Sequence, residues 1–504
     1  MEDLIFSGEE KDMIYSFHHF YEWLRGGVES GMAYRAKVFR KLGLEAKFVF
    51  ATTFPNDNVW DEMERLGFLD SEIIWLYGFF TDCRISPVTY TLEQLEASFG
   101  EETFTCSRDG RNVKYIFPGY NRYYEVILAD SGGDRVHRVC MISNGCLLRQ
   151  DYYTYCRIYS EYYVPVDGLA HLYLRRFFNE DGSVAYEEIL DEDQTMYRFS
   201  DRILYSREEL VGHMMSCLQL TENDVVLIDG EPGMIDRSAF ILNAAPAKTG
   251  FIMHSNHYVA EGDDHILWYG IYEYAFAHPE KIDFYVTNTE AQSTLLREQF
   301  QKYKGLEPEV VAIPVSGVDR LRIPDVERSR HSLIAAGRLM LGKRMDWVVE
   351  AVAMARKKIP DLSLDIYGEG IEEGKIRKRI EELDCGEYVH LCGFQKLDEV
   401  YQEYDAYVSA SCGETFGVTF LEAAGSGLPI IGFDAPYGAQ VFIDDGRNGY
   451  KLTEESPESL AKGIVRLFTE ADIEKFRRHS YEKAKEYLME EVAKRWNDIL
   501  ELSR

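Results

Sequence analysis

Residues 406–434 have the sequence "AYVSASCGETFGVTFLEAAGSGLPIIGFD", in which two short apolar runs enclose a glycine-containing loop and a longer apolar segment. Short apolar runs bounded by glycine or polar residues are typical of buried strands. The segment between them, from about Phe416 to Ala424, predicts a helix. A strand, a helix and a second strand in this order form the repeating unit of a parallel α/β sheet.

The same alternation extends over the second half of the chain. Further strand-like runs are "SLIAAG", "LSLDIYG" and "YVHLCGF", and segments with helical periodicity are "MDWVVEAVAMARKK" and "EEGKIRKRIEEL". We therefore expect residues 321–485 to form a Rossmann-like domain, in which helices cover both faces of a parallel sheet.

The first half of the chain shows the same pattern with a long interruption. Strand-like runs lie at residues 13–17, 46–52 and 73–79, and the series resumes at 225–230, 251–257, 283–288 and 310–315. These runs predict another Rossmann-like domain built from residues 1–82 and 211–320, with residues 83–210 inserted. We expect the last segment, 486–504, to be a helix that returns to this first domain.

The insertion holds close to half of the chain's 34 tyrosines, many in alternating runs such as "DYYTYCRIYSEYYVP". Alternation with aromatic and β-branched residues predicts antiparallel strands. One face of such a sheet can bind a partner, because tyrosine is enriched at interfaces. The sheet can equally be a meander that covers only itself, and the sequence leaves both interpretations open.

Charge and cysteine content limit the classes of function. The chain has 504 residues, with 55 basic against 86 acidic side chains and a formal net charge of −31, which argues against binding to nucleic acid or to an anionic membrane. An anionic small ligand remains possible where local cations and helix N-termini gather. The nine cysteines have no paired spacing, and neither a secretory leader nor an apolar run long enough to span a membrane is evident. We therefore expect a cytoplasmic protein without a zinc site.

Two cations follow the strand "SLIAAG" in the loop "GRLMLGKR", residues 337–344. Ligands of an open parallel sheet bind beyond the carboxyl ends of its strands, where this loop should lie. The planar fork of Arg338 and the mobile ammonium of Lys343 together can neutralise a diphosphate. Taken alone, the loop can also be a solvated basic segment.

Two carboxylates, Glu414 and Glu422, lie around the predicted helix start. Free N–H groups at that start can hold a phosphate or sugar hydroxyls. Eight residues at 100° each place the two acids about 80° apart in projection, so both can face one cleft if the helix begins early. The alternative is that the first acid merely stabilises the helix dipole.

The first domain offers weaker candidates. Gly26 and Gly27 form a tight loop after the first strand, where a backbone can approach a ligand closely. His254 and His257 end a strand in "FIMHSNHYV". No third ligand has metal-site spacing nearby, so hydrogen bonds to substrate or core are favoured over a metal.

The ordered set "GRLMLGK", "YGEG", "LCGF" and the two glutamates in an E-x7-E arrangement resembles the retaining family 4 glycosyltransferases of GT-B fold. That resemblance implies an α/β fold with two Rossmann-like domains facing a cleft, a UDP-sugar donor and no metal cofactor. Within the family, the segments "GGVESGMAYRAKVFRKLG", "HSNHYV" and "GFDAPYGAQVFIDDGRNGY" and the β-rich insertion are similar to catalytic subunits of bacterial O-glycosyltransferases that modify serine-rich-repeat adhesins.

The resemblance also implies partners and a location. It implies UDP-N-acetylglucosamine or UDP-glucose as donor, a Ser/Thr-rich protein as acceptor and a non-catalytic paralogue bound through the insertion. It implies a cytoplasmic enzyme with at most peripheral contact at the inner face of the membrane. Two alternatives stay open: a wall teichoic acid glycosyltransferase, whose insertion is similar, and a silent paralogue that only binds acceptor.

The roles of individual residues are carried over from the family. Arg338 and Lys343 would hold the diphosphate, Glu414 the sugar hydroxyls and Glu422 the ribose. The remaining donor contacts implied by the family are Gly26, Gly27, His254, His257, Phe394, Phe416, Gly417, Val418 and Thr419. Among these, His257 would lie near the reacting carbon, the backbone at Phe394 would receive the uracil, and backbone N–H groups from Phe416 to Thr419 would hold sugar and phosphate.

Overall fold

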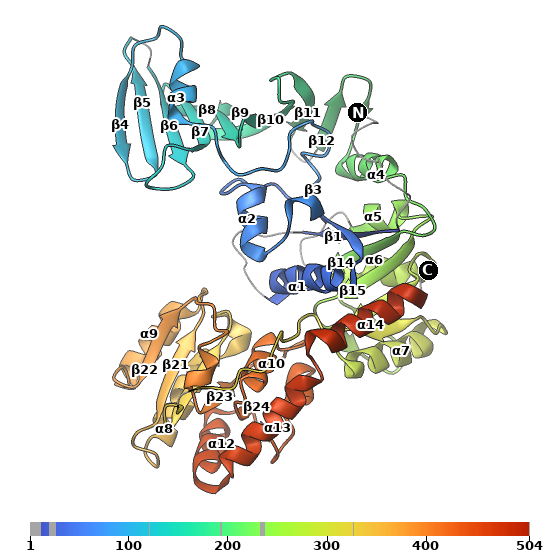
Figure 1. The fold of residues 1–504 in the computed structure, drawn as a ribbon, viewed down its shortest axis with the longest axis vertical. Helices are drawn as coiled ribbons and strands as arrows, with labels where there is room; N and C mark the ends of the chain where they lie inside the picture. Colours follow the sequence, from blue (N-terminus) through green and yellow to red (C-terminus); the bar gives the residue numbers. More distant parts are fainter. Residues whose placement is uncertain are drawn as a thin grey trace.

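The computed structural model describes residues 12–19, 27–119, 121–191, 194–231, 237–325 and 327–502. Three bodies follow one another along its longest axis (Figure 1). The β-rich insertion is at the top, the first Rossmann-like domain is in the middle, and the second is at the bottom. The α/β fold class expected from the sequence is confirmed.

The first domain contains a seven-stranded parallel sheet of order β19-β18-β15-β14-β1-β2-β3. Its strands are β1 (Met13–His18), β2 (Glu45–Phe50), β3 (Ile73–Trp75), β14 (Val225–Gly230), β15 (Lys248–Met253), β18 (Phe284–Thr287) and β19 (Val310–Ala312). These strands are nearly continuous apolar runs because helices bury both faces of the sheet. The strand order reverses between β1 and β14, so the loops after these two strands diverge and leave a crevice.

Helices cover this sheet, and one of them comes from the far end of the chain. They are α1 (Gly27–Leu42), α2 (Val59–Leu66), α4 (Arg207–Cys217), α5 (Arg237–Asn243), α6 (Gly270–Ala277), α7 (Glu290–Lys304) and α14 (Met489–Leu502). On α14, the Trp496 ring packs edge-on against Phe39 of α1, with 5.4 Å between ring centroids. The C-terminal helix therefore belongs to the first domain's core.

The chain crosses between the two Rossmann-like domains after β19 and returns after α13 (Ile473–Lys485). The two crossing segments pair with each other. The Val318 N–H donates to the Tyr487 carbonyl at 3.0 Å, and the Met489 N–H donates to the Val318 carbonyl at 3.1 Å. The connection is therefore a short hydrogen-bonded ribbon.

The insertion contains a ten-stranded antiparallel meander in which each strand pairs with the next along the chain. Its strands are β4 (Thr105–Asp109), β5 (Asn112–Phe117), β6 (Arg122–Leu128), β7 (Val136–Ser143), β8 (Cys146–Tyr153), β9 (Arg157–Val166), β10 (Leu169–Phe178), β11 (Val184–Asp191), β12 (Gln194–Phe199) and β13 (Ile203–Leu204), with helix α3 (Leu92–Ala97) beside β4–β7. A ladder of stacked rings crosses the sheet, including Tyr152 on Tyr159 at 4.2 Å and Phe177 on Tyr186 at 4.5 Å between centroids. Much of the tyrosine enrichment therefore builds the core.

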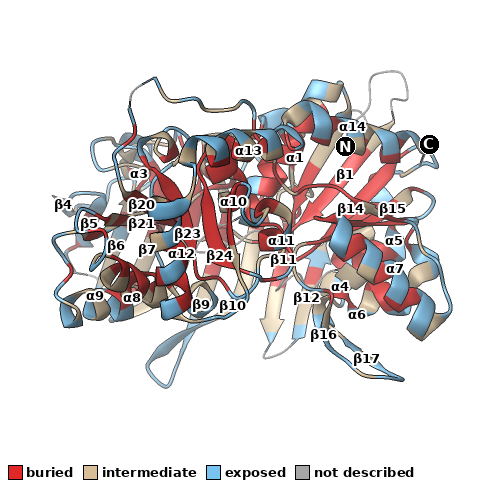
Figure 2. Cartoon of the chain, turned by 90° about the horizontal axis from the view of Figure 1, so that it is seen from below, coloured by how far each residue is buried: buried red, intermediate tan, exposed pale blue. Residues whose placement is uncertain are grey.

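The second domain contains a six-stranded parallel sheet of order β22-β21-β20-β23-β24-β25. Its strands are β20 (Ser332–Ala336), β21 (Ser363–Tyr367), β22 (Val389–Gly393), β23 (Ala406–Ser409), β24 (Ile430–Phe433) and β25 (Gly449–Leu452), and its longer helices besides α13 are α8 (Met345–Ala355), α9 (Glu373–Glu382), α10 (Val418–Gly425) and α12 (Pro457–Glu470). Figure 2 shows the strands of both parallel sheets largely buried between helices. Here the strand order reverses between β20 and β23.

Candidate functional site

The two domains approach each other at the N-termini of helices α1 and α10. A Cβ atom added to Gly27 would lie 3.6 Å from a methyl group of Val418, so the first turn of each helix faces the other across the interface. A short distance away, burial and the nearby Tyr258 of the first domain raise the pKa of Tyr437 in the second. Both helix starts lie at the crevices where strand order reverses, which is where such sheets bind ligands.

Glycines shape the loops that follow β20 and β21. Gly368 and Gly370 have φ of 134° and 158°, and a Cβ on either would meet the carbonyl oxygen of Gly337 or Leu339 at 2.0 or 2.4 Å. The Leu339 N–H donates to the Glu369 carbonyl at 2.9 Å. The backbones of the segments "GRLMLGK" and "YGEG" are thus in close contact. This contact fixes the positions from which the side chains of Arg338 and Lys343 extend.

Lys343 and Glu414 form an ion pair at the second domain's crevice. Lys343 follows β20 and Glu414 follows β23, the two strands that flank the reversal. The Ser411 hydroxyl also donates to Glu414 at 2.8 Å. The Glu414 backbone is fixed to the 436–438 segment, where the Gly438 N–H donates to its carbonyl at 2.6 Å. The pair is therefore held by its backbone while its charged ends remain partly exposed.

The side chain of Arg338 is exposed, and it makes no hydrogen bond or ion pair among the described residues. Its backbone carbonyl accepts a hydrogen bond from the Met340 N–H at 2.9 Å. It starts one residue after Gly337, in the same loop as Lys343. A guanidinium without a partner beside a crevice can take up an anion.

The start of α10 presents unused backbone donors. Gly417 caps the helix with φ of 85°, where a side chain would meet the Phe420 ring at 2.8 Å. In the part of the chain that the structure describes, the N–H groups from Phe416 to Thr419 donate to no other group. Phe416 itself is buried, so only its backbone is available. These donors suit an anion or hydroxyl groups.

The helix begins two residues later than predicted, which separates the two glutamates. Glu414 lies before the helix and pairs with Tyr437, whereas Glu422 lies within α10. The condition that the helix begins early is therefore not met, and helical projection does not relate the two acids. The Tyr401 hydroxyl donates to Glu422 at 3.0 Å, and burial raises the pKa of Glu422 to about 7.

An aromatic side chain stands exposed near this wall. Phe394 follows β22 directly and is 58% exposed. The Gly368 N–H donates to the Gly393 carbonyl at 2.9 Å, which places Phe394 beside the glycine-containing loop after β21.

A buried charge cluster lies at the first domain's crevice. Arg35 of α1 donates two hydrogen bonds to Asp229 at the end of β14, at 2.8 and 2.9 Å. His254 bonds the same carboxylate through Nε2, and His18 Nδ1 lies 3.2 Å from it. These groups hold the pKa of Asp229 well below its usual range despite burial, whereas burial lowers the pKa of His18 to about 3.

His257 is not part of the crevice. Its ring is fully buried, and Nε2 bonds the Gln299 side chain of α7 at 2.7 Å. Burial lowers the pKa of His257 to about 4, so the ring is neutral. In this structure the ring lies inside the first domain, and the contact with the donor sugar predicted for His257 stays a prediction. Gly26 lies outside the described residues.

One group of described residues has the spacing of metal ligands, namely His18, Asp229 and Glu231. Arg35 and His254 already occupy both oxygens of Asp229, and Arg35 would repel a cation. We assign this cluster no metal. Within the described part of the chain, no helix combines the length and apolarity needed to cross a bilayer.

Two Rossmann-like domains that meet at a ligand-binding crevice are the arrangement of the GT-B glycosyltransferases, and the family matches agree with that class. Residues 330–470 match the family "Glycosyl transferases group 1", and residues 105–201 match the "GtfA extended beta-sheet domain".

Relatives that match almost the whole chain show to which group of glycosyltransferases it belongs. The chain is 41% identical over 488 residues to the "UDP-N-acetylglucosamine--peptide N-acetylglucosaminyltransferase GtfA subunit" of Streptococcus gordonii, covering 95% of this chain and 96% of that one. The pneumococcal O-GlcNAc transferase GtfA, solved with UDP and GlcNAc, superposes with a TM-score of 0.94 at 37% identity, covering 98% and 99% of the two chains. A GtfA/B complex matches with a TM-score of 0.90 at 39% identity, again covering 98% and 99%. The chain belongs to the family of these GtfA subunits.

Proposed function

We propose that this chain is the catalytic subunit of a retaining transferase that moves N-acetylglucosamine from UDP-N-acetylglucosamine to Ser/Thr hydroxyls of a serine-rich-repeat protein. The observation that carries the proposal is the Lys343–Glu414 pair at the second domain's crevice. A silent acceptor-binding paralogue would not need to keep it. The similarity to UDP-N-acetylglucosamine–peptide N-acetylglucosaminyltransferase subunits supports this donor and a peptide acceptor.

Arg338 and Lys343 would neutralise the diphosphate and the charge that develops as UDP leaves. Preorganised cations of this kind usually supply the largest single contribution to such transfers. The Lys343 ammonium donates to Glu414, so the diphosphate would share this ammonium with the carboxylate. The unpartnered Arg338 can swing to the phosphates without breaking a bond.

The remaining donor contacts come from the same domain. Glu414 would accept hydrogen bonds from the sugar hydroxyls, and Glu422 from the ribose. The N–H groups of Phe416, Gly417 and Val418 would hold the sugar, and that of Thr419 the phosphate. The exposed position of Phe394 supports a uracil contact by its backbone.

The first domain would supply the opposite wall. Gly27, with Gly26 before it, allows the start of α1 to approach the sugar or phosphate. Of the two histidines, His254 is the better placed, because Asp229 fixes its ring at the crevice. We therefore propose that His257 only stabilises the segment that carries His254.

We further propose that retention follows from front-face attack, in which the leaving phosphate helps to take the acceptor proton. Neither glutamate then acts as a nucleophile or general base. Because two cations neutralise the diphosphate, no metal is required, and transfer should continue in EDTA.

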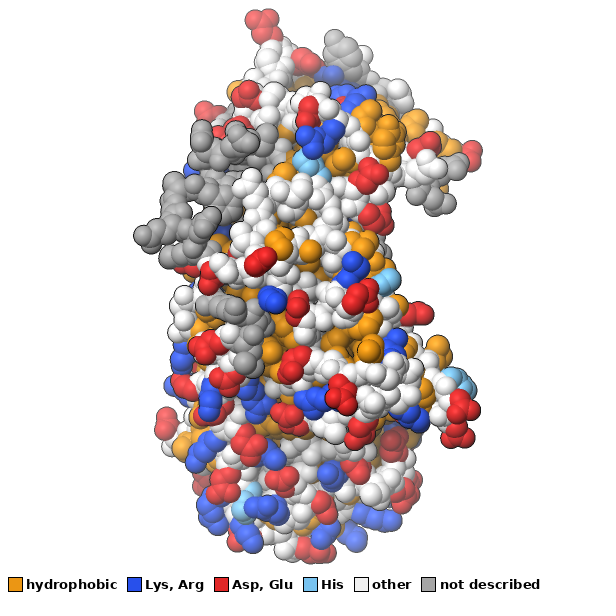
Figure 3. All heavy atoms as spheres, turned by 90° about the vertical axis from the view of Figure 1, so that its right-hand side faces the viewer, with side chains coloured by type: hydrophobic (Ala, Val, Ile, Leu, Met, Phe, Trp, Pro, Cys, Tyr) orange, Lys and Arg blue, Asp and Glu red, His pale blue; other side chains and the backbone are white. Residues whose placement is uncertain are grey.

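The GtfA/B complex of relatives supports a second subunit, and we propose that this subunit is non-catalytic and contacts the insertion. All nine cysteines are free, which supports a cytoplasmic location. At most a peripheral contact with the inner face of the membrane is expected. In Figure 3, acidic and basic side chains are interspersed over the lower, second domain, without a large basic patch on this face.

The deciding experiment measures UDP release and transfer with UDP-N-acetylglucosamine and UDP-glucose, using a serine-rich peptide with and without a co-expressed paralogue. We expect a preference for UDP-N-acetylglucosamine and faster transfer when the paralogue is present. Preference for UDP-glucose would change the donor. Transfer to teichoic acid but not to peptide would replace the acceptor, although the charge of −31 makes a polyanion the weaker candidate.

A further inference from the structure

Two cysteines face each other at the seam between the first domain and the insertion. Cys83 lies in the segment that leads from β3 into the insertion, and Cys156 lies in the turn between β8 and β9. Their Sγ atoms are 3.7 Å apart. Both thiols are free, and in the described part of the chain no other two cysteine sulfurs are in contact. Two thiols from separate parts of the chain therefore form one site.

Hydrogen bonds hold the two chain segments beside each other. The Arg84 N–H donates to the Tyr155 hydroxyl at 2.9 Å, which joins the residue after Cys83 to the residue before Cys156. The Cys83 sulfur also lies 3.3 Å from the Phe178 carbonyl oxygen of β10, within hydrogen-bonding range. The fold therefore brings the two sulfurs together before any bond forms between them, which favours their reaction with each other.

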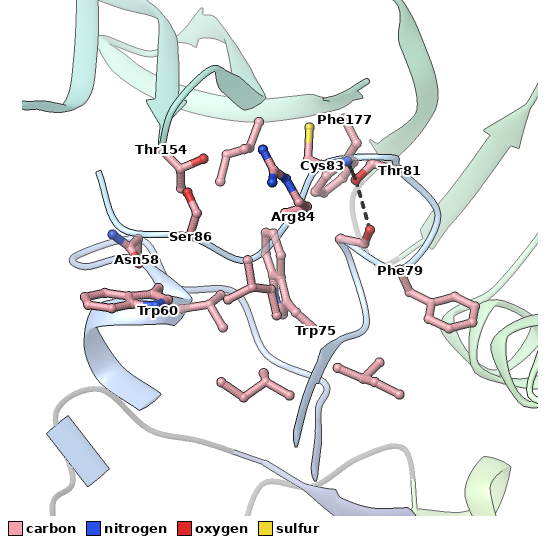
Figure 4. Close-up of a pocket in the computed structure, with 16 residues that line it drawn as sticks. Asn58, Trp60, Trp75, Phe79, Thr81, Cys83, Arg84, Ser86, Thr154 and Phe177 are labelled. Atoms are coloured by element: carbon pink, nitrogen blue, oxygen red, sulfur yellow. Dashed lines mark hydrogen bonds between the residues drawn. The ribbon is translucent and has the colours of Figure 1, made fainter. Parts of the chain in front are cut away.

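A small reagent can reach this site. Both cysteines are partly exposed, and Cys83 lies between the exposed residues Asp82 and Arg84 in a segment without helix or strand. Cys83 also lines a pocket with a cavity volume of about 190 Å³, and Figure 4 shows its sulfur at the edge of this space, beside Phe177. Packing around Cys83 is therefore incomplete, so its sulfur has room to approach Cys156 to the disulfide bond length of about 2.05 Å.

The contact between the sulfurs also makes one of them the better nucleophile. A hydrogen bond from Cys83 lowers the pKa of the Cys156 thiol, against the opposing effects of burial and of the nearby carboxylates of Glu180 and Asp82. The same contact raises the pKa of Cys83. Because the thiolate is the reactive form of cysteine, Cys156 is the sulfur that should react first, with the Cys83 thiol beside it.

We propose that Cys83 and Cys156 form a reversible redox site, at which a hydroperoxide oxidises the two thiols to a disulfide. The Cys156 thiolate attacks a peroxide oxygen, so that an S–O bond forms, the O–O bond breaks and hydroxide leaves, taking a proton from solvent to become water. The Cys83 sulfur then attacks the sulfur of the resulting sulfenic acid, an S–S bond forms, and the S–O bond breaks with release of a second water. The two sulfurs lose the two electrons that the peroxide gains.

The disulfide ties the middle of the ten-stranded sheet to the segment through which the chain enters the insertion. In the reduced protein this seam is held by hydrogen bonds such as that between Arg84 and Tyr155. A cross-link removes the conformations in which the two segments separate. The reaction needs no group of the donor crevice and is independent of the proposed transferase activity.

Peptide mapping of the full chain tests the proposal. The reduced protein is treated with hydrogen peroxide, its remaining thiols are blocked with N-ethylmaleimide, and its tryptic peptides are analysed without reduction. Trypsin cleavage sites at Arg65, Arg84, Arg149 and Arg157 place the two cysteines in separate peptides. We expect these two peptides to be joined, and dithiothreitol added to the folded protein to separate them. The pair should be oxidised about tenfold faster than the exposed Cys217, which has no sulfur beside it.

Variants separate the roles of the two thiols. In Cys83→Ser, the Cys156 sulfenic acid should persist and react with dimedone, and the cross-link should be absent. Cys217→Ser, a matched loss of an exposed thiol, should leave the cross-link unchanged. If Cys83→Ser folds poorly by thermal melting, the peptide map of the unsubstituted chain still decides. No cross-link in protein whose Cys217 is already oxidised overturns the proposal, as does a cross-link between other cysteines or one that dithiothreitol reduces only after unfolding.

Hydrogen exchange tests the effect on the seam. Backbone amides of residues 81–84 and 154–156 should exchange about tenfold more slowly in the oxidised protein, because the cross-link suppresses local opening. Dithiothreitol should restore the faster exchange. Equal exchange in the oxidised and reduced proteins would contradict the tie between the insertion and the segment that leads into it.

Discussion

The two walls of the donor crevice handle charge in opposite ways. On the second domain, the side chains of Lys343 and Glu414 are 24% and 14% exposed. On the first, Asp229 is fully buried and shared by Arg35, His18 and His254. A partly exposed pair can exchange partners when an anion arrives, whereas a buried cluster cannot do so without a large penalty. We therefore expect the Lys343–Glu414 wall to respond to ligand and the Asp229 wall to hold its groups in fixed positions.

The largest effect, a loss of stability, is expected from a substitution in the buried Asp229 cluster of the first domain. Asp229→Asn removes the only carboxylate that the Arg35 guanidinium bonds among the described residues and leaves that charge buried. Breaking such a pair should lower the free energy of unfolding by about 3–5 kcal/mol. Urea unfolding measures this. The matched change Asp130→Asn, in an exposed pair with Arg135, should leave unfolding unchanged. Equal stability of both variants would show that the cluster is not structural.

A substitution in the Lys343–Glu414 pair should lower the rate of sugar transfer without changing the fold. Lys343→Ala removes a cation proposed to stabilise the leaving diphosphate, so kcat/KM should fall about a hundredfold while the melting temperature is kept. Transfer assays with UDP-N-acetylglucosamine measure it. Lys375→Ala, in a surface pair with Asp346 of the same domain, serves as control. Near-normal transfer by Lys343→Ala would contradict the assignment of the donor site.

Glu414→Gln is a milder change at the same wall. The amide can still accept the Ser411 hydroxyl, but it no longer pairs with Lys343 and binds sugar hydroxyls more weakly. We expect about a tenfold loss of transfer. The control is Glu455→Gln, because Glu455 pairs with Arg344, the residue next to Lys343. A loss of the same size in both variants would mean that general charge, not the sugar contact, is responsible.

The smallest effect concerns pH. Burial raises the pKa of Glu422 to about 7, so the acid is largely protonated below that pH. Its carboxylate accepts ribose hydroxyls better than its acid form, so UDP affinity should rise about threefold as pH increases from about 6 to about 8. Fluorescence titration with UDP follows this change. In Glu422→Gln the rise should disappear, and its persistence would assign it to another group.

Much of the architecture could be predicted because burial on both faces leaves long apolar runs. The runs at 225–230, 332–336 and 406–409 became strands as expected, and glycines marked the loops between them. Boundaries were less certain. The run at 73–79 yields only three strand residues, and α10 starts at Val418, since Gly417 adopts a left-handed conformation that no periodicity reveals.

Long-range pairing could not be predicted from spacing. Arg35 and Asp229 lie 194 positions apart, and Arg35 looks like one of several cations on an amphipathic helix. The available clue was an aspartate at the end of the buried run "VVLIDG", since a charge there needs a partner. The different fates of His254 and His257 follow from where β15 ends, which the sequence pattern does not define.

The hydrogen-bonded ribbon at Val318 and Tyr487 has a mechanical consequence. Two chain segments joined side by side resist twisting and sliding, so the second domain can swing about the line they define but cannot rotate freely. We therefore expect any relative motion of the two domains to follow a single hinge axis. Such a hinge would bring the start of α10 back to the same place opposite Gly27.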